Sequence, residues 1–322
     1  MSSDRWRVVV TRRLPAPVEA ALAAAGVDAV FNPTDDPLDP DALVRAAREA
    51  DIVLCTVGDR IPPAFFEPLM RARALVNFGV GLDHIPLTLA REAGVIVTNT
   101  PDVLTDDTAD LTMLLLLAAM RRASEGEREL RDGHWNGWAP THLLGARLTG
   151  KTLGIIGLGR IGTAVARRAS RGFDMRVQYL ARTERRIEGV PLHRCATLEE
   201  LLESSDAVSV HVASTPDTRR MLGAREFALM RRDAVLVNTA RGDIVDESAL
   251  ISALEQGTIA GAGLDVYAHE PTIPAELLRL PQVTLLPHLG SATRETRVAM
   301  GERALGSLVA IVAGREPPDR VV

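Results

Sequence analysis

The stretch that decides the fold is Leu153-Gly-Ile-Ile-Gly-Leu-Gly-Arg-Ile-Gly162, an apolar run that continues into three spaced glycines. An apolar strand followed at once by this glycine pattern and a helix is typical of dinucleotide-binding domains. In that pattern Gly157 permits the tight turn, Gly159 lets a pyrophosphate approach the backbone, and Gly162 lets the helix pack closely on the strand. The N-terminus of the helix then faces the phosphates, where its N–H groups and dipole favour negative charge.

A second glycine pattern directly precedes this region. Residues 145–152 match the phosphate-binding loop of nucleoside triphosphatases letter for letter. That loop requires a strand before it and a helix after it, so that backbone amides converge on a phosphate. Here the segment leads into the strand at 153–156, and no strand pattern precedes it. We therefore interpret this match as coincidental.

The rest of the chain alternates between strand patterns and helix patterns. We expect strands at residues 7–10, 52–55, 74–78 and 95–97, and a second series at 153–156, 176–180, 207–212, 234–238, 260–266 and 283–286. Such alternation predicts parallel βαβ units. A chain of 322 residues has room for two domains, so the expected fold is α/β with two doubly wound parallel sheets.

The composition argues against several kinds of partner. Lys and Arg number 37 against 42 Asp and Glu, a net charge of −5, so no nucleic-acid partner is expected. The longest apolar run, residues 113–120, is too short to span a membrane, which needs about 20 such residues. Cys55 and Cys195 belong to no paired-cysteine motif, which fits a reducing compartment. We expect a cytoplasmic protein with no membrane partner.

Polar residues follow three successive strands of the second series. Arg241 comes just after the strand at 234–238 and is suited to clamp a carboxylate with two parallel hydrogen bonds. Asp265 ends the next strand, and Glu270 follows it in a loop. His288 comes directly after the last strand. Ligands of open α/β sheets bind at the carboxyl ends of the strands, so we expect these side chains to form a site.

The end of the strand at 176–180 bears on the choice of cofactor. An NAD-binding domain usually carries an acidic residue about 20 positions after the glycine pattern, where it binds the adenosine ribose. Here that position is Ala181, and Arg182 and Thr183 follow it. An arginine can pair with a 2′-phosphate, which favours NADP(H). The alternative is a solvated arginine at a strand end.

With these motifs in this order, the sequence resembles the D-isomer-specific 2-hydroxyacid dehydrogenases, from residues 77–83 through His288. Residues 135–140, 179–183 and 287–293 resemble the glyoxylate/hydroxypyruvate reductase branch of that family. The resemblance implies a Rossmann-type cofactor domain over residues 101–287. It also implies a flavodoxin-like substrate domain made of residues 1–100 and 288–322.

The resemblance also implies roles for individual residues. Arg241 would hold the substrate carboxylate with the backbone amides of Val80 and Gly81, and His288 would donate a proton to the carbonyl oxygen. Glu270 would bond and orient the ring of His288. The cofactor contacts implied are Thr105, Gly157, Leu158, Gly159, Arg160, Ile161, Gly162, Arg182, Thr183, Val212, Thr239, Ala240, Arg241, Asp265, His288 and Gly290.

The expected reaction is therefore hydride transfer from NADPH, with NADH also possible, to a small 2-oxo acid, giving the D-2-hydroxy acid. No metal is expected. Related formate dehydrogenases lack a glutamate partner for the histidine, and phosphoglycerate dehydrogenases usually carry an extra regulatory domain. Two alternatives stay open: another 2-hydroxyacid dehydrogenase of the family, or a non-catalytic, corepressor-like module that binds a dinucleotide.

The helix expected at 103–122 raises the question of oligomeric state. In the family this region and the following loop form a dimer interface, and the tryptophan that matches Trp138 reaches toward the active site of the neighbouring subunit. The resemblance thus implies a homodimer. Leucines on nearly every face of the helix also favour a second covering surface. The alternative is a helix buried wholly within its own chain.

Overall fold

The computed structural model describes residues 5–322, which divide into two compact units. The terminal unit runs up to Leu104 and also includes Thr293–Val322, and the central unit is Thr105–Ala292. The sequence placed these boundaries at residues 100 and 288. In the structure they fall later, so His288 and Gly290 belong to the central unit.

The terminal unit is built on a five-stranded parallel sheet with the order β2-β1-β3-β4-β5. Its strands are β1 (Arg7–Val10), β2 (Asp28–Phe31), β3 (Ile52–Thr56), β4 (Ala74–Phe78) and β5 (Ile96–Thr98). The sequence missed β2, a short edge strand whose residues alternate between exposed and partly buried. The end of the chain also pairs with this sheet, since Val321 N donates to Val97 O at 2.7 Å.

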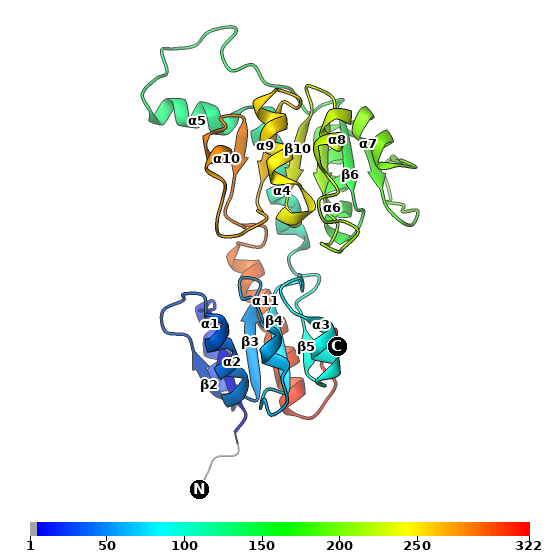
Figure 1. Cartoon of the computed structure of the whole chain (residues 1–322). Helices are drawn as coiled ribbons and strands as arrows, with labels where there is room; N and C mark the ends of the chain where they lie inside the picture. Colours follow the sequence, from blue (N-terminus) through cyan, green and yellow to red (C-terminus); the bar gives the residue numbers. More distant parts are fainter. Residues whose placement is uncertain (1–4) are drawn as a thin grey trace. The chain divides into compact units, whose positions relative to one another are not determined.

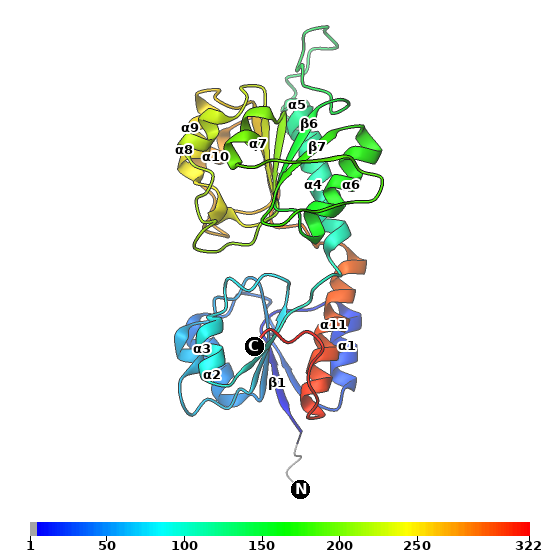
Figure 2. The same cartoon turned by 90° about the vertical axis from the view of Figure 1, so that its right-hand side faces the viewer.

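Helices cover both faces of this sheet (Figure 2). On one face lie α1 (Ala16–Ala24) and α11 (Arg294–Val312), and on the other α2 (Pro40–Glu49), α3 (Leu87–Glu92) and the 3₁₀ turn η1 (Pro63–Phe66). The last helix crosses α1 closely at Gly301, where a Cβ atom would lie 2.3 Å from a methyl carbon of Val18. The two segments of the terminal unit, far apart in sequence, therefore share one core.

The central unit is built on a seven-stranded parallel sheet with the order β12-β11-β10-β9-β6-β7-β8. Its strands are β6 (Thr152–Ile156), β7 (Arg176–Leu180), β8 (Leu192–Arg194), β9 (Ala207–Val210), β10 (Val235–Asn238), β11 (Gly261–Leu264) and β12 (Val283–Leu285). The sequence predicted six of them and missed β8, a short, largely exposed strand at the edge. The fold class is as expected.

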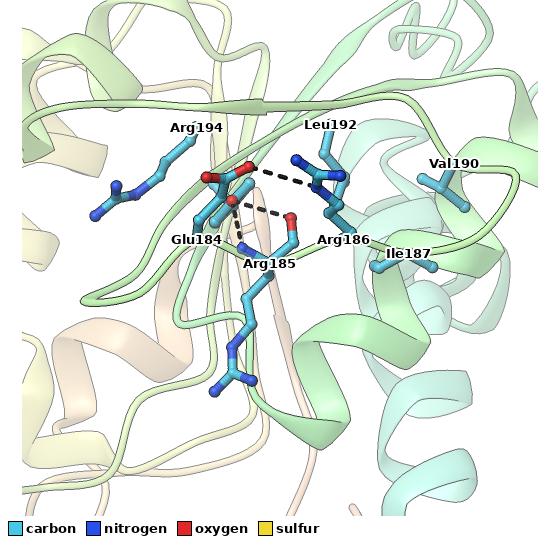
Figure 3. Close-up of a pocket in the computed structure, with 8 residues that line it drawn as sticks. Glu184, Arg185, Arg186, Ile187, Val190, Leu192 and Arg194 are labelled. Atoms are coloured by element: carbon cyan, nitrogen blue, oxygen red, sulfur yellow. Dashed lines mark hydrogen bonds and ion pairs between the residues drawn. The ribbon is translucent and has the colours of Figure 1, made fainter.

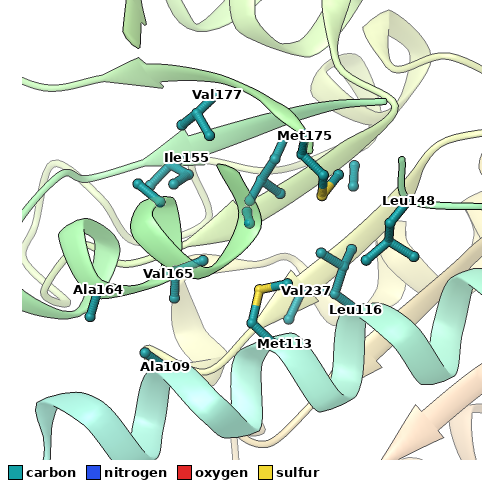
Figure 4. Close-up of a cluster of buried hydrophobic side chains, with 14 of the residues drawn as sticks. Ala109, Met113, Leu116, Leu148, Ile155, Ala164, Val165, Met175, Val177 and Val237 are labelled. Carbon is teal, nitrogen blue, oxygen red and sulfur yellow. The ribbon is translucent and has the colours of Figure 1, made fainter. Parts of the chain in front are cut away.

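Helices lie on both sides of this sheet (Figure 2). They are α4 (Thr105–Met120), α5 (Ala123–Arg131), α6 (Arg160–Phe173), α7 (Leu198–Ser204), α8 (Ala224–Leu229), α9 (Glu247–Glu255) and α10 (Ala275–Arg279), together with the 3₁₀ turn η2 (Gly242–Ile244). Figure 4 shows how Met113 and Leu116 of α4 pack near Ile155 of β6 and Val165 of α6. In the described residues no helix has both the length and the apolar character needed to cross a bilayer.

The leucine-rich helix α4 is mostly covered by its own unit. Most of its apolar side chains are buried against α6, β10 and β11, and only Leu114, at 52% exposure, stands out. Most of the leucines on this helix are thus covered within one chain, and a second subunit that covers the rest remains a prediction. The segment after α5 differs, because it loops out from the unit (Figure 1) and exposes 84% of Trp138.

Candidate active site

The predicted site residues of the central unit follow the carboxyl ends of its strands. The glycine loop follows β6, Arg182 and Thr183 follow β7, and Val212 follows β9. After β10, β11 and β12 come the residues Thr239, Ala240, Arg241, Asp265, His288 and Gly290. All these strands are parallel and adjacent, so the loops emerge at one edge of the sheet. Thr105 is the first residue of α4.

The glycine loop has the geometry that a dinucleotide phosphate needs. Gly157 has a positive φ of 95°, and a Cβ there would lie 2.7 Å from the carbonyl oxygen of His211. A Cβ on Gly162 would lie 2.3 Å from the carbonyl oxygen of Gly157. Gly159, the N-cap of α6, has no atom within 4 Å of its would-be Cβ, so space lies open at the start of the helix. The loop therefore fits a bound pyrophosphate.

His211, which the sequence did not single out, packs beside this turn. Its backbone N–H donates to the carbonyl of Ile156 at 2.7 Å, and its Nε2 lies 2.8 Å from Ser209 Oγ. Burial lowers the pKa of His211 to about 3, so the ring is neutral at physiological pH. It supports the glycine turn without adding a positive charge to it.

Two threonines of α4 form hydrogen bonds with loops of the site, and the sequence did not single them out either. Thr108 Oγ1 donates to the carbonyl of Gly290 at 2.9 Å, and Thr112 Oγ1 lies 2.9 Å from Thr239 Oγ1. Their spacing of four puts both on the face of α4 turned toward the site. Two threonines at this spacing, next to the apolar second half of the helix, are a pattern from which the sequence could have indicated them.

The loop that carries Arg241 is held by its own side chains. Asn238 donates through Nδ2 to the carbonyl of Arg241 at 2.8 Å and accepts from the N–H of Ala240 at 3.0 Å. The Arg241 Nη1 atom donates to the carbonyl of Ala240 at 2.7 Å. A Cβ on Gly242 would lie 1.9 Å from the backbone of Tyr267, so only glycine lets this loop pack against the one after β11.

The residues after β11 and β12 form a connected network. Glu270 Oε2 lies 2.8 Å from His288 Nδ1, and Glu270 Oε1 accepts from the N–H of Tyr267 at 3.0 Å. Burial raises the pKa of Glu270, but the hydrogen bond and charge of His288, with lesser help from Arg241, outweigh it and leave the pKa lowered. The carboxylate therefore stays charged beside the ring.

Asp265 fixes the backbone around His288. Its carboxylate is buried and accepts from the N–H groups of Leu289 at 2.6 Å and Gly290 at 2.8 Å, while its carbonyl accepts from His288 N at 2.9 Å. Burial raises the pKa of Asp265, against the effect of these hydrogen bonds. His288 adopts a left-handed φ of 55°, a conformation that few non-glycine residues take up. The network holds that conformation in place.

This arrangement suits proton transfer next to a carboxylate-binding group. A charged Glu270 accepts a hydrogen bond only from a protonated Nδ1, which leaves Nε2 of His288 as the atom that can exchange a proton with a ligand. Arg241 belongs to the neighbouring loop, and its positive charge helps to lower the pKa of Glu270. An acid/base group and a guanidinium at the same edge of one sheet can act together on a 2-oxo or 2-hydroxy acid.

The rim beyond β7 is exposed and rich in arginine. Arg182 is exposed, and Nη2 of Arg194 donates to the carbonyls of Ala181 at 3.1 Å and Arg182 at 3.2 Å. The segment that follows β7 helps to line a pocket of about 520 Å³ (Figure 3), where Nε of Arg186 lies 3.6 Å from Oε1 of Glu184. Its lining residues are Tyr179, Glu184, Arg185, Arg186, Ile187, Val190, Leu192 and Arg194.

The predicted substrate residues Val80 and Gly81 lie in the terminal unit, after β4. Asn99 Nδ2 donates to the carbonyl of Val80 at 3.0 Å, and Asn77 Nδ2 donates to that of Gly81 at 2.9 Å. These bonds fix the orientation of the peptide groups in the loop. Such side-chain supports of a backbone loop leave no distinct pattern in the sequence.

A family model places this architecture among known proteins. Residues 113–290 match the model described as D-isomer specific 2-hydroxyacid dehydrogenase, NAD binding domain. The chain belongs to this family. The match covers the glycine loop, Arg241, Glu270 and His288. The sequence-based identification is thereby confirmed.

Individual relatives agree with this assignment. The chain is 44% identical to a glyoxylate reductase of Thermococcus litoralis, over 87% of this chain and 86% of the relative. It is 41% identical to a glyoxylate reductase of Korarchaeum cryptofilum, over 98% and 95% of the two chains. Each of these relatives is thus matched over most of its length.

Solved structures extend the likeness to three dimensions. A protein of Thermus thermophilus has a TM-score of 0.91 and 45% identity, covering 98% of this chain and all of the other. An NADPH-dependent glyoxylate/hydroxypyruvate reductase of Sinorhizobium meliloti, solved in complex with NADP and malonate, has a TM-score of 0.86 and 35% identity over 99% and 97% of the chains. Family and fold together make this chain a nicotinamide-dependent oxidoreductase.

Proposed function

We propose that this chain reduces glyoxylate and hydroxypyruvate to the corresponding 2-hydroxy acids, glycolate and D-glycerate, with NADPH as the preferred cofactor. The observation that carries the proposal is the 2.8 Å contact between Glu270 and Nδ1 of His288 in the loops next to Arg241. The names of the relatives, glyoxylate reductase and glyoxylate/hydroxypyruvate reductase, support the substrate class.

Each residue then has a defined task. Arg241 binds the substrate carboxylate through its guanidinium, with the backbone of Val80 and Gly81 as further contacts. His288 gives the proton on Nε2 to the carbonyl oxygen while the carbonyl carbon accepts a hydride, so the substrate gains both at once. The nicotinamide supplies that hydride. Glu270 stabilises the positive ring before transfer and keeps it oriented.

The cofactor is held by the edge of the central sheet. The N-terminus of α6 and the open space at Gly159 suit the pyrophosphate, and Asp265, Gly290 and the loop at Thr239–Arg241 lie further along the same edge. Arg182 is the candidate partner of the 2′-phosphate, with Thr183 and Arg160 as further contacts. Support comes from Arg194, which donates to the consecutive carbonyls of Ala181 and Arg182, and from the absence of an acidic residue at position 181.

Three further parts of the proposal concern organisation. The central unit serves as the cofactor domain and the terminal unit as the substrate domain. The chain acts as a homodimer in which Trp138, exposed on its protruding loop, reaches the active site of the second subunit. A cytoplasmic location is supported by the two free thiols, Cys55 and Cys195.

The test is a turnover assay of the purified chain with glyoxylate, hydroxypyruvate and pyruvate, each with NADPH and with NADH. We expect turnover of the first two acids, with higher kcat/KM for NADPH. No turnover with any pair, but tight binding of NADPH, would favour the non-catalytic, corepressor-like alternative. A preference for pyruvate would favour another 2-hydroxyacid dehydrogenase of the family.

A further inference from the structure

Three side chains with metal-binding atoms meet at the open edge of the central sheet. They are His193, Cys195 and Glu200, and their candidate ligand atoms all lie within 4.8 Å of one another. His193 and Glu200 are exposed, whereas Cys195 is only 1% exposed. None of the three has a part in the reaction proposed above.

The backbone of each of these three residues is fixed by the surrounding structure. His193 lies in β8, opposite Gln178 of β7, and the N–H of Cys195 donates to the carbonyl of Tyr179 at 2.9 Å. Glu200 lies in the first turn of α7, where its Oε2 accepts from the N–H of Ala196 at 2.7 Å. Its other oxygen, Oε1, faces Nε2 of His193 at 3.2 Å. One oxygen of the carboxylate is thus anchored, and the other is directed at the cluster.

We propose that His193, Cys195 and Glu200 form a binding site for a thiophilic divalent transition-metal ion, Zn²⁺ above all. A thiolate, an imidazole and a carboxylate are the three ligand types that Zn²⁺ takes in proteins, and a water molecule can complete the tetrahedron. Ligand atoms around Zn²⁺ are about 3.3–3.8 Å apart, given its bond lengths of about 2.0–2.3 Å. The candidate ligand atoms lie within 4.8 Å of one another, so metal binding requires them to draw closer together.

The ligand set also argues for the class of ion. Mg²⁺ and Ca²⁺ prefer oxygen ligands alone, and a thiolate with an imidazole selects softer ions. On binding, the thiol of Cys195 gives its proton to the solvent. Thiolate and carboxylate then carry two negative charges, which balance the charge of the ion. A neutral complex suits a thiol that is buried.

The site would have a local mechanical effect. Two ligands come from β8 and the following residue, and the third comes from α7, so a bound ion ties the outermost strand to the next helix. Arg194 lies between two of the ligands, and its own side chain braces the end of β7. An ion that binds only the folded chain stabilises it by mass action. The sequence predicted no metal because the pattern His-Arg-Cys followed five residues later by Glu is not a known metal-binding motif.

The experiment is a titration of the full-length, untagged chain with Co²⁺, followed by displacement with Zn²⁺. We expect about one Co²⁺ per chain, a thiolate-to-cobalt charge-transfer band and tetrahedral d–d bands. Cys195→Ser should abolish the charge-transfer band. His193→Ala and Glu200→Gln should each weaken Co²⁺ binding at least about tenfold, because each removes a direct ligand. Zn²⁺ should raise the Tm of the wild type more than that of His193→Ala.

The chain offers two matched controls. Cys55→Ser removes the other buried thiol, and His142→Ala breaks a second His–Glu pair, 3.2 Å from Glu129, that has no cysteine beside it. Both controls should bind Co²⁺ as the wild type does. The proposal is overturned if the wild type shows no thiolate–cobalt band, or if the band survives in Cys195→Ser. If Cys195→Ser does not fold, the test rests on His193→Ala, because His193 is exposed and its loss should not disturb folding. Unchanged Co²⁺ affinity in His193→Ala would then overturn the proposal.

Discussion

The two ends of the central sheet are built in opposite ways. At the β10–β12 end, side chains are partly or fully buried and each is held by several hydrogen bonds, as with Asp265 and Glu270. At the β7–β8 end, exposed arginines lie in the segment that follows β7 and at the end of the short edge strand β8. Proton transfer depends on fixed geometry, whereas recognition of a phosphate relies on charge and tolerates movement. Substitutions at the β10–β12 end should therefore lower the reaction rate strongly. Substitutions at the β7–β8 end should instead alter the preference between NADPH and NADH.

The largest effect is expected from His288→Asn. Asparagine keeps a polar group but cannot donate a proton as imidazolium does, so kcat for glyoxylate reduction should fall roughly 10²–10⁴-fold. NADPH affinity, measured by fluorescence titration, should change little. His269→Asn, an exposed histidine one position before Glu270, serves as control and should keep wild-type kcat. A kcat for His288→Asn within twofold of wild type would remove His288 from the mechanism.

The second effect tests the opposite end of the sheet. Arg182→Ala should lower kcat/KM for NADPH by about tenfold or more and leave that for NADH nearly unchanged, since a charge-assisted hydrogen bond contributes about 1.5–3 kcal/mol. The matched control is Arg186→Ala, an exposed arginine that pairs with Glu184. An equal loss with both cofactors would show that Arg182 does not read the 2′-phosphate.

The third effect concerns the pH dependence of the rate. The pKa of Glu270 is lowered in the fold, so its charge is present above the ordinary range near pH 4 and is lost only as the pH falls through the lower folded value. Above that range the carboxylate is charged and can accept the hydrogen bond from Nδ1 of His288. Glu270→Gln should move the pH at which reduction slows to a lower value, because an amide stabilises imidazolium less. The measurement is kcat/KM against pH, with the exposed Glu276→Gln as control. Overlapping profiles for Glu270→Gln and wild type would exclude Glu270 as the partner.

The smallest effect is expected from Trp138→Ala. If this exposed side chain closes the active site of a second subunit, its removal should raise kcat/KM for bulkier 2-oxo acids a few-fold relative to glyoxylate, without loss of NADPH binding. Trp135→Ala, in the same loop, is the control: it shows whether the loss of any exposed indole from this loop changes the substrate preference. Light scattering gives the oligomeric state, and a monomer at assay concentration would contradict the proposal.

The sequence predicted the centre of the fold better than its edges. Inner strands such as β6 and β10 are buried on both faces and read as apolar runs, whereas β2 and β8 are short edge strands that stay partly exposed. The pairing of Glu270 with His288 followed from the resemblance to the family. The supports of that pair did not, because the hydrogen bonds of Thr108 and Asp265 join residues far apart in the chain. The packing of α4 inside its own unit could not be predicted either, because α6, β10 and β11 lie far from it in the sequence.

The terminal unit is built from two segments far apart in the sequence, and this affects how the chain folds during synthesis. Residues 5–104 form the sheet, but α11 covers one of its faces and Val321 pairs with Val97 only when the last thirty residues exist. On the ribosome, the first segment to emerge must therefore wait for the last to complete its core. The central unit is contiguous and can finish folding earlier, although it is synthesised second. Shortening the chain within α11 should leave a folded central unit attached to an exposed apolar sheet.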